Sequence, residues 1–348
     1  QTFPPRRPLL SLVYALLIFI VLAAALEGTA RLPWAAARLP RYRSVGNYHY
    51  PFEIKWFGLK RYVARQGSLD ILIMGNSMAN TGVDPQIIAS IYAERTGRTV
   101  RAYNFGLEGL TLHANLELAG ILLEEYRPRL LVYIADVRDL DDSNSPSTER
   151  RFLSDPWLRY RLGDWNLEGW LFDHSQALQM YLPYRNWVRA DFPDTFYAYL
   201  YRSTTISETG YEADTNVTVL DDDALAAIRQ SPECTAYYPA IEIGEARLAE
   251  LRAFLALGAA QGARVFIAEM PVNPIVYECM TGAVDHAAFQ RVMDETVTAA
   301  GGVFLAFRSE IPAVDHIDMH HLNQEGAAIF SQQLALALLE ADALSGQP

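Results

Sequence analysis

The chain has 348 residues, of which 51% are hydrophobic and 20% are charged, so it can bury a sizeable core in one large domain or two. Its net charge of -12 at neutral pH argues against a nucleic-acid partner, because no surplus of Lys and Arg is present to neutralise phosphates. Composition therefore predicts a globular protein whose partners are not nucleic acids.

The first predicted element is an apolar helix near the N-terminus. Residues 9–26, LLSLVYALLIFIVLAAAL, carry no charge, and at about 1.5 Å per residue they span roughly 27 Å, close to the hydrocarbon thickness of a bilayer. No face of this segment is polar, so we expect a membrane-spanning anchor within residues 1–30. A cleaved signal peptide is the alternative, because small residues follow at 23–25. Arginines flank the segment on both sides and do not fix the orientation.

Beyond a connector at residues 31–68, short apolar runs alternate with amphipathic segments. Strand, helix, strand, helix in this order predicts an α/β fold, a three-layer α/β/α sandwich around a parallel sheet. The expected strands are residues 71–74, 100–104, 130–135, 265–269 and 303–306, and the expected helices are residues 85–95, 112–126, 245–261, 285–300 and 323–343. This domain is expected to span residues 69–338, with a C-terminal tail at residues 339–348.

The alternation fails between about residues 140 and 243. This segment carries four tryptophans, many tyrosines and an acidic patch at residues 221–223, and it is too long for a structureless loop. We expect an insertion that folds over the sheet edge as a lid or docking surface. Its aromatic side chains either form a local core or offer a platform for carbohydrate.

The two cysteines, Cys234 and Cys279, lie 45 positions apart without metal-like spacing and without a neighbouring histidine cluster. No zinc site is expected from this pattern, and no other metal is indicated. In an oxidising compartment the pair could form one disulfide that closes a long loop, and the alternative is two unrelated buried thiols.

A candidate nucleophile follows the first predicted strand. Residues 70–85 read DILIMGNSMANTGVDP, so a short apolar run ends on Gly-Asn-Ser. Such a run is typical of a strand buried on both faces of a parallel sheet. Ser77 then lies at the carboxyl edge of the sheet, where open α/β folds bind their ligands. Gly-Asn-Ser is also an ordinary turn sequence.

A candidate base lies near the C-terminus, in the stretch AVDHIDMHHLNQEGAAIF. Asp318 and His321 are three residues apart, so the carboxylate can orient the imidazole toward a serine brought from elsewhere in the fold. His320 is the rival base, but it is only two positions from Asp318. Asn323 is the predicted N-cap of the last helix.

A candidate oxyanion-binding loop follows the second predicted strand, in the stretch YNFGLEGLT at residues 103–111. Gly106 and Gly109 permit a tight loop whose backbone N–H groups point toward the sheet edge. A developing oxyanion needs donors in that position.

Taken in order, Gly-x-Ser, Asn-x-Gly-x-x-Gly and Asp-x-x-His resemble the SGNH, or GDSL-type, hydrolase superfamily over roughly residues 69–338. The resemblance implies that Ser77 is the nucleophile, His321 the general base and Asp318 the carboxylate that orients it. It also implies that the N–H groups of Ser77 and Gly109 form the oxyanion hole. The supporting loop residues would be Asn76, Asn104 and Gly106.

One block departs from this pattern. After the third strand the superfamily normally has Gly-x-Asn-Asp, whose asparagine donates to the oxyanion, but the stretch IADVRDL places Arg138 there. Arg138 could donate to the oxyanion, bind an anionic group of the substrate, or pair with one of the nearby carboxylates of Asp136, Asp139 and Asp141.

The anchor, Gly-Asn-Ser in place of Gly-Asp-Ser, and HLNQEG in place of His-Pro are together similar to bacterial SGNH-like proteins of surface-polymer modification, such as the teichoic-acid D-alanylation and alginate O-acetylation proteins. This resemblance implies a serine O-acyltransferase or esterase without a cofactor, held at the cytoplasmic membrane with its catalytic domain outside. The implied partners are a multi-spanning membrane-bound O-acyltransferase as acyl donor and a polysaccharide acceptor. The alternatives are a catalytically degenerate scaffold that assembles a membrane complex, and an SGNH lipase or thioesterase.

Overall fold

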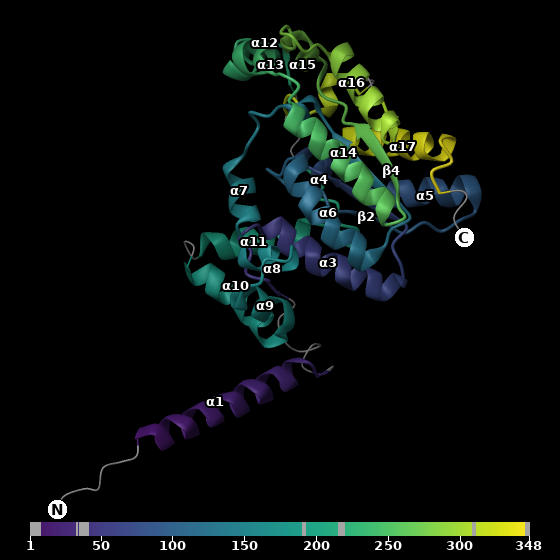
Figure 1. Ribbon diagram of the computed structural model, residues 1–348. Helices are drawn as coiled ribbons and strands as arrows, with labels where there is room; N and C mark the ends of the chain where they lie inside the picture. Colours follow the sequence, from purple (N-terminus) through teal and green to yellow (C-terminus); the bar gives the residue numbers. More distant parts are fainter. Residues whose placement is uncertain are drawn as a thin grey trace, which may run out of the picture. The chain divides into compact units, whose positions relative to one another are not determined.

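The computed structural model describes residues 8–32, 34, 42–189, 193–214, 220–307 and 311–344 (Figure 1). Its centre is one sheet of five parallel strands in the order β2-β1-β3-β4-β5. The strands are β1 (Ile71–Gly75), β2 (Ala102–Asn104), β3 (Leu130–Ala135), β4 (Arg264–Glu269) and β5 (Val303–Leu305). The predicted α/β class with a parallel sheet is therefore confirmed.

The strand order places a topological switch point beside β1. The chain passes from β1 to β2 on one side and then returns to β3 on the other. Every residue of β1 and β3 is buried, as expected for the inner strands of a parallel sheet. Ligands of open parallel sheets bind at the carboxyl ends of the strands beside such a point.

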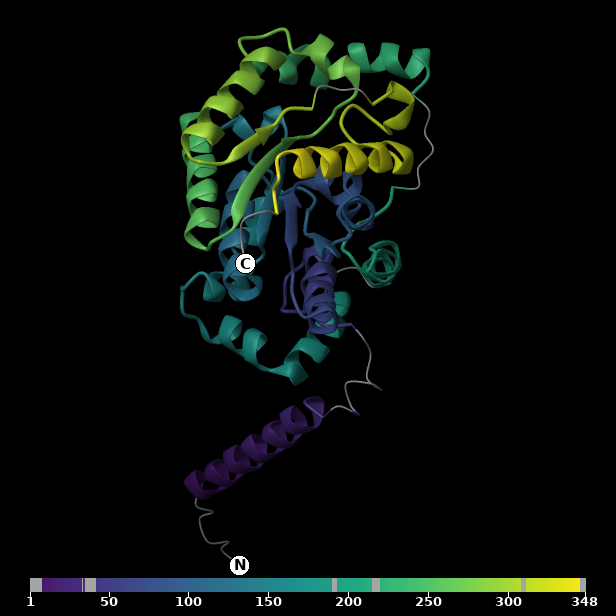
Figure 2. The ribbon, with the colours of Figure 1, turned by 90° about the vertical axis from the view of Figure 1, so that its right-hand side faces the viewer.

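Helices occupy most of the remaining chain. They are α1 (Pro8–Ala30), α3 (Tyr50–Gln66), α4 (Ser77–Gly82), α5 (Pro85–Thr96), α6 (Leu112–Tyr126), η1 (Val137–Leu140), α7 (Ser147–Leu153), α8 (Pro156–Arg161), α9 (Leu167–His174), α10 (Gln176–Arg189), α11 (Asp194–Thr205), α12 (Asp222–Arg229), η2 (Glu233–Tyr237), α13 (Tyr238–Ala240), α14 (Glu245–Ala260), α15 (Pro274–Cys279), α16 (His286–Ala299), η3 (Ala313–Asp315) and α17 (Gln324–Glu340). Helix α14 packs against α6 and β4, and α17 packs against α4 and α5. Figure 2 shows α17, in yellow, crossing in front of the strands in this view.

Several helices begin at a side-chain cap. The predicted N-cap Asn323 is confirmed, since its side chain accepts from the N–H groups of Glu325 and Gly326. Asp84 caps α5 by accepting from Gln86 N–H. Such caps satisfy backbone donors that the first turn of a helix leaves unpaired.

The chain divides into two compact units. One comprises residues 1–48 and 155–197, and the other, which holds the sheet, comprises residues 49–154 and 198–348. Residues 50–66, within the expected connector, instead form α3 in the sheet unit, where Phe52, Trp56 and Leu59 are buried. The expected insertion is helical and is shared between the two units.

The aromatic side chains of the insertion have two environments. Trp157 and Trp187 are buried within their unit, so they belong to a local core. Trp165 is 74% exposed, and Trp170 is half-exposed and stacks on the His174 ring at 5.2 Å. The structure therefore supports the local-core interpretation for two of these tryptophans and leaves two on the surface.

The N-terminal helix has the properties of a membrane span. An 18-residue window of its segment Leu10–Ala30 has a mean hydropathy of 2.5, and no residue of that window is buried. A helix of 21 residues at about 1.5 Å per residue is long enough to cross the hydrocarbon core. At its carboxyl end, the Glu27 carboxylate accepts from the N–H groups of Gln176 and Ala177, which tie α1 to the start of α10.

Candidate active site

The Ser77 side chain lies where β1 gives way to α4. Gly75 ends the strand with φ +147°, and a Cβ there would lie 2.8 Å from the Ile134 carbonyl oxygen, so only glycine fits. Asn76 caps α4, since its Oδ1 accepts from Met78 N–H at 2.9 Å. This sharp turn places Ser77 at the first position of α4, at the carboxyl edge of the sheet.

Ser77, His321 and Asp318 form a continuous hydrogen-bonded chain. His321 Nε2 lies 2.8 Å from Ser77 Oγ, and His321 Nδ1 lies 2.7 Å from Asp318 Oδ2. Because a carboxylate can only accept, the neutral ring carries its proton on Nδ1 and offers the Nε2 lone pair to the serine hydroxyl. This is the geometry of a serine activated by an oriented general base.

The Asp318 carboxylate also shapes the loop that carries the histidine. Its Oδ1 accepts from the backbone N–H groups of His320 and His321, at 2.8 and 2.7 Å. Burial raises the pKa of Asp318, but the hydrogen bond from His321 and the facing His320 outweigh it and hold this pKa below its usual value. Asp318 is therefore ionised at neutral pH and accepts at both oxygens.

The rival base His320 faces a different group. Its Nε2 lies 3.4 Å from Arg138 Nη1, and its ring packs beside His321 with centroids 4.3 Å apart. Burial and the adjacent Arg138 charge hold the pKa of His320 well below its usual value. A neutral ring whose Nε2 accepts from Arg138 has no contact with Ser77 among the described residues, so the geometry favours His321.

Arg138 is the second residue of η1, just after β3, and of the three nearby carboxylates it pairs with Asp136. Its Nε donates to Asp136 Oδ2 at 2.7 Å, while Nη2 lies 3.3 Å from the Met78 sulfur. Burial lowers the pKa of Arg138, but the Asp136 charge outweighs it and raises the pKa above its ordinary value. Asp139 instead accepts from Tyr133 Oη at 2.9 Å. The Arg138 guanidinium is thus charged, held in place, and part of the wall of the cleft described below.

The glycine loop lies against α4. Asn104 Nδ2 donates to the Ala79 and Val83 carbonyls, and its Oδ1 accepts from Gly106 N–H. A Cβ on Gly106 would lie 2.6 Å from the Asn80 nitrogen, so this glycine permits the close approach of loop and helix. Asn104 and Gly106 therefore hold the glycine loop against α4, the helix that begins at Ser77.

Gly109 and Ser77 line one cleft of about 480 Å³ at the carboxyl edge of the sheet. Gly109 has φ +64°, in the left-handed region that favours glycine. Among the described residues, neither the Ser77 N–H nor the Gly109 N–H donates to a protein acceptor. The remaining cleft residues are Asn76, Leu110, Thr111, Arg138, Asp139, Asn144, Pro146, Pro232, Glu233 and Tyr237.

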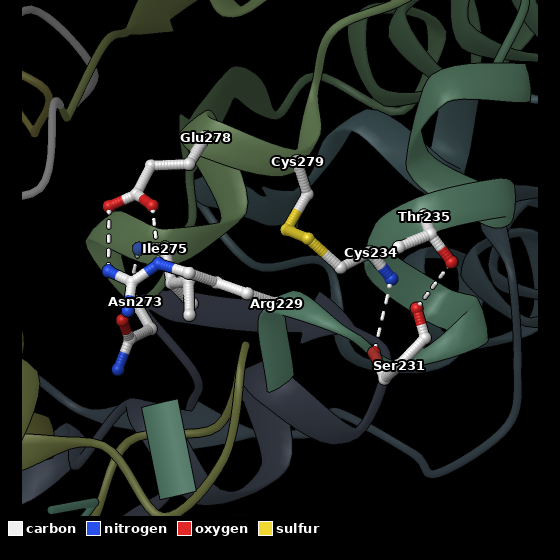
Figure 3. Close-up of a disulfide and its surroundings, with 8 residues drawn as sticks. All are labelled: Arg229, Ser231, Cys234, Thr235, Asn273, Ile275, Glu278 and Cys279. Atoms are coloured by element: carbon white, nitrogen blue, oxygen red, sulfur yellow. Dashed lines mark hydrogen bonds and ion pairs between the residues drawn. A yellow bond between two sulfur atoms is a disulfide. The ribbon is translucent and has the colours of Figure 1, made fainter. Parts of the chain in front are cut away.

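A disulfide holds one wall of this cleft. Cys234 in η2 is bonded to Cys279, the last residue of α15 (Figure 3). Figure 3 also shows the exposed pair between Arg229 and Glu278, 2.8 Å apart, which joins the end of α12 to the same helix. Glu233 of η2 lines the cleft, so the cross-link fixes the part of the insertion that faces the serine.

The same loop offers a set of metal-ligating atoms. Ligand atoms of Asp318, His320 and His321 lie within 4.8 Å of one another. In the arrangement described here both ring nitrogens of His321 are engaged, one by Asp318 and one by Ser77. A metal at this position would therefore have to displace the serine contact or the carboxylate contact.

Sequence reasoning missed the residues that hold the glycine loop from behind. Lys55, fully buried on α3, donates to the Gly106 carbonyl at 2.7 Å, and His49 contacts the Glu108 carbonyl at 2.8 Å. The only sequence indication was Tyr-Pro directly after His49, a pattern typical of a helix start. It did not reveal which loop the helix would meet.

No protein-family model matches this chain, and no curated protein is significantly similar to it in sequence.

Proposed function

We propose that this protein is a membrane-anchored serine O-acyltransferase or esterase with an SGNH-type, three-layer α/β/α catalytic domain. The observation that carries the proposal is the chain of contacts from Ser77 Oγ to His321 Nε2, at 2.8 Å, and from His321 Nδ1 to Asp318 Oδ2, at 2.7 Å. These groups come from opposite ends of the domain sequence, 244 positions apart for serine and histidine.

The first half-reaction forms an acyl-serine. His321 Nε2 takes the proton of the Ser77 hydroxyl as Oγ attacks the acyl carbonyl carbon of the donor. The N–H groups of Ser77 and Gly109 donate to the tetrahedral oxyanion, which is the largest catalytic contribution expected of such a site. The intermediate collapses, the bond to the leaving oxygen breaks, and the imidazolium of His321 returns its proton to that oxygen.

The second half-reaction transfers the acyl group. His321 deprotonates an acceptor hydroxyl, whose oxygen attacks the acyl-serine carbonyl, and Ser77 leaves with the proton restored to Oγ. Water as acceptor makes the protein an esterase, and a sugar hydroxyl makes it a transferase. The cleft wall supplied by Tyr237, Glu233 and Asn144 combines an aromatic ring with polar groups, which suits a carbohydrate acceptor.

The location proposed for the catalytic domain is outside the cytoplasmic membrane. The apolar span Leu10–Ala30 supports an anchor, and the Cys234–Cys279 disulfide supports an oxidising compartment. A polysaccharide acceptor and a multi-spanning acyltransferase that delivers the acyl group complete the proposal. Both follow from the resemblance to surface-polymer acylation proteins.

One observation favours a second candidate, a scaffold without catalysis. Arg138 stands where related enzymes carry an oxyanion-donating asparagine, and its Nε is committed to Asp136. Loss of one oxyanion donor costs roughly 100- to 1,000-fold in rate, so the site would be slow if Arg138 does not donate. The experiment below separates a slow enzyme from an inert scaffold.

The test is intact mass spectrometry of the full chain in detergent micelles after exposure to a fluorophosphonate or to p-nitrophenyl acetate. Wild type is expected to gain one adduct, and Ser77→Ala is expected to gain none. The control Ser90→Ala removes an exposed serine of α5 and should still gain one adduct. No adduct on the folded wild type, or an adduct that persists in Ser77→Ala, would contradict the proposed nucleophile and favour the scaffold.

A further inference from the structure

The peptide bond between Glu108 and Gly109 is the part of the cleft whose orientation matters most for the proposed chemistry. Gly109 N–H has no protein acceptor among the described residues and belongs to the cleft that Ser77 lines. A trans peptide is planar, so its C=O and N–H point in opposite directions. Whatever binds the Glu108 carbonyl therefore sets the direction of the Gly109 N–H.

His49 binds that carbonyl and caps a helix at the same time. Its Nδ1 accepts from the Phe52 N–H at 3.2 Å, at the N-terminus of α3. Its Nε2 lies 2.8 Å from the Glu108 carbonyl oxygen. An N–H can only donate and a carbonyl can only accept, so both contacts are satisfied by the neutral ring with its proton on Nε2. Burial lowers the pKa of His49, which keeps the ring in this neutral form near neutral pH.

We propose that His49 is a positioning residue that aims the Gly109 N–H into the cleft by binding the carbonyl of the same peptide. This role rests on the proposed function, because an aimed N–H matters only if an oxyanion forms beside Ser77. His49 itself lies behind the loop and contacts neither Ser77 nor His321 among the described residues.

The choice of residue supports this role. A cap alone would be satisfied by Asn, Asp or Ser, which are the preferred N-cap residues. Histidine adds a second nitrogen on the far side of the ring, and this nitrogen reaches Glu108.

Two further contacts hold the same loop. The Glu108 carboxylate pairs with Arg202 of α11 at 2.8 Å, and Lys55 donates to the Gly106 carbonyl at 2.7 Å. Neither contact touches the peptide between residues 108 and 109. Both would keep the loop in place when His49 is changed, so a substitution at His49 tests the peptide orientation and not the presence of the loop.

Two substitutions separate the roles of the two ring nitrogens. His49→Asn keeps a good N-cap but is too short to reach the Glu108 carbonyl, whereas His49→Gln keeps a longer donor and is a poor cap. We expect His49→Asn to lower kcat for p-nitrophenyl acetate about 10- to 100-fold and to change KM less than threefold. This fall in kcat is no larger than the fall expected when a whole oxyanion donor is removed. The rate of fluorophosphonate labelling should fall in parallel.

A merely structural role predicts the opposite ranking. If His49 positions the peptide, activity should decrease in the order wild type, His49→Gln, His49→Asn. The thermal midpoint of His49→Asn should stay near that of wild type, whereas the midpoint of His49→Gln should fall. His174→Asn, which changes an exposed histidine of α9, is the matched control and should alter neither quantity.

The outcomes are distinguishable. If the wild-type full chain labels at Ser77 and His49→Asn reacts within twofold of it, the role of His49 is refuted while the proposed function stands. If activity falls only in step with the thermal midpoint, His49 acts through stability and the positioning role is again refuted. If wild type takes no label at all, the proposed function fails and the role of His49 fails with it.

Discussion

Replacing Asp318 by asparagine should disable the base without disturbing the loop. The carboxylate Oδ1 accepts from two backbone N–H groups and Oδ2 accepts from His321 Nδ1. An asparagine keeps its oxygen on the backbone donors and turns its NH₂ toward the ring. His321 Nδ1 must then accept, its proton moves to Nε2, and Nε2 donates to Ser77 where it should accept.

The size of the loss follows from the two interactions that change. In Asp318→Asn, the tautomer with its proton on His321 Nδ1 would place that N–H against the asparagine NH₂, and two donors that face each other cost about 1–3 kcal/mol. The variant also loses the charge-assisted hydrogen bond between the imidazolium and the carboxylate, which is worth about 1.5–3 kcal/mol. The Asp318 side chain is 44% exposed, and solvent screens this charge, so the lower half of the range applies. About 3–4 kcal/mol corresponds to a loss of roughly 100- to 1,000-fold in kcat/KM.

The assay is steady-state hydrolysis of p-nitrophenyl acetate by the full chain in micelles, with the thermal midpoint measured in parallel. Asp285→Asn is the matched control, because Asp285 caps α16 and asparagine caps equally well. If Asp318→Asn lowers the Ser77-dependent kcat/KM less than fivefold while the thermal midpoint is unchanged, the tautomer argument is refuted.

Three further predictions concern stability, each measured as an unfolding free energy in denaturant. Gly106→Ala should lose at least about 2 kcal/mol of stability, because the new Cβ would lie 2.6 Å from the backbone of α4. The control Gly120→Ala, at an open position of α6, should gain up to about 1 kcal/mol, and equal effects of the two substitutions would contradict the clash. Breaking the Cys234–Cys279 disulfide, which closes a separation of 45 residues, should cost about 4 kcal/mol by chain entropy, and a loss below about 1 kcal/mol would count against that account. Burial lowers the pKa of His316 to about 4 from its ordinary 6.5, so the unfolded chain binds the extra proton first and stability should fall as pH drops from 6.5 to 4, by about 3 kcal/mol in total. His316→Asn should remove that part of the slope, and an unchanged slope would show that other groups cause it.

Much of the sheet could be predicted because its strands are local apolar runs. The expected segments at residues 71–74 and 130–135 match β1 and β3, both buried throughout. Helix α3 was missed because residues 50–66 mix buried aromatics with charged residues, among them the fully buried Lys55. That lysine is tolerated because a carbonyl of a distant loop accepts its hydrogen bond and the Glu212 and Glu108 charges favour its ammonium, although burial lowers its pKa to about 7.

The sequence by itself determined the parts of the site that depend on short spacing. The Gly-Asn-Ser turn, the three-residue separation of Asp318 and His321, and the apolar N-terminal segment all act through neighbouring backbone, so their geometry follows from local chemistry. Only the tertiary structure decided which of two adjacent histidines meets Ser77 and what holds the Gly109 peptide. Those outcomes depend on contacts between segments tens to hundreds of residues apart, whose distances are fixed by the packing of the whole sheet and cannot be read from the spacing of any one stretch.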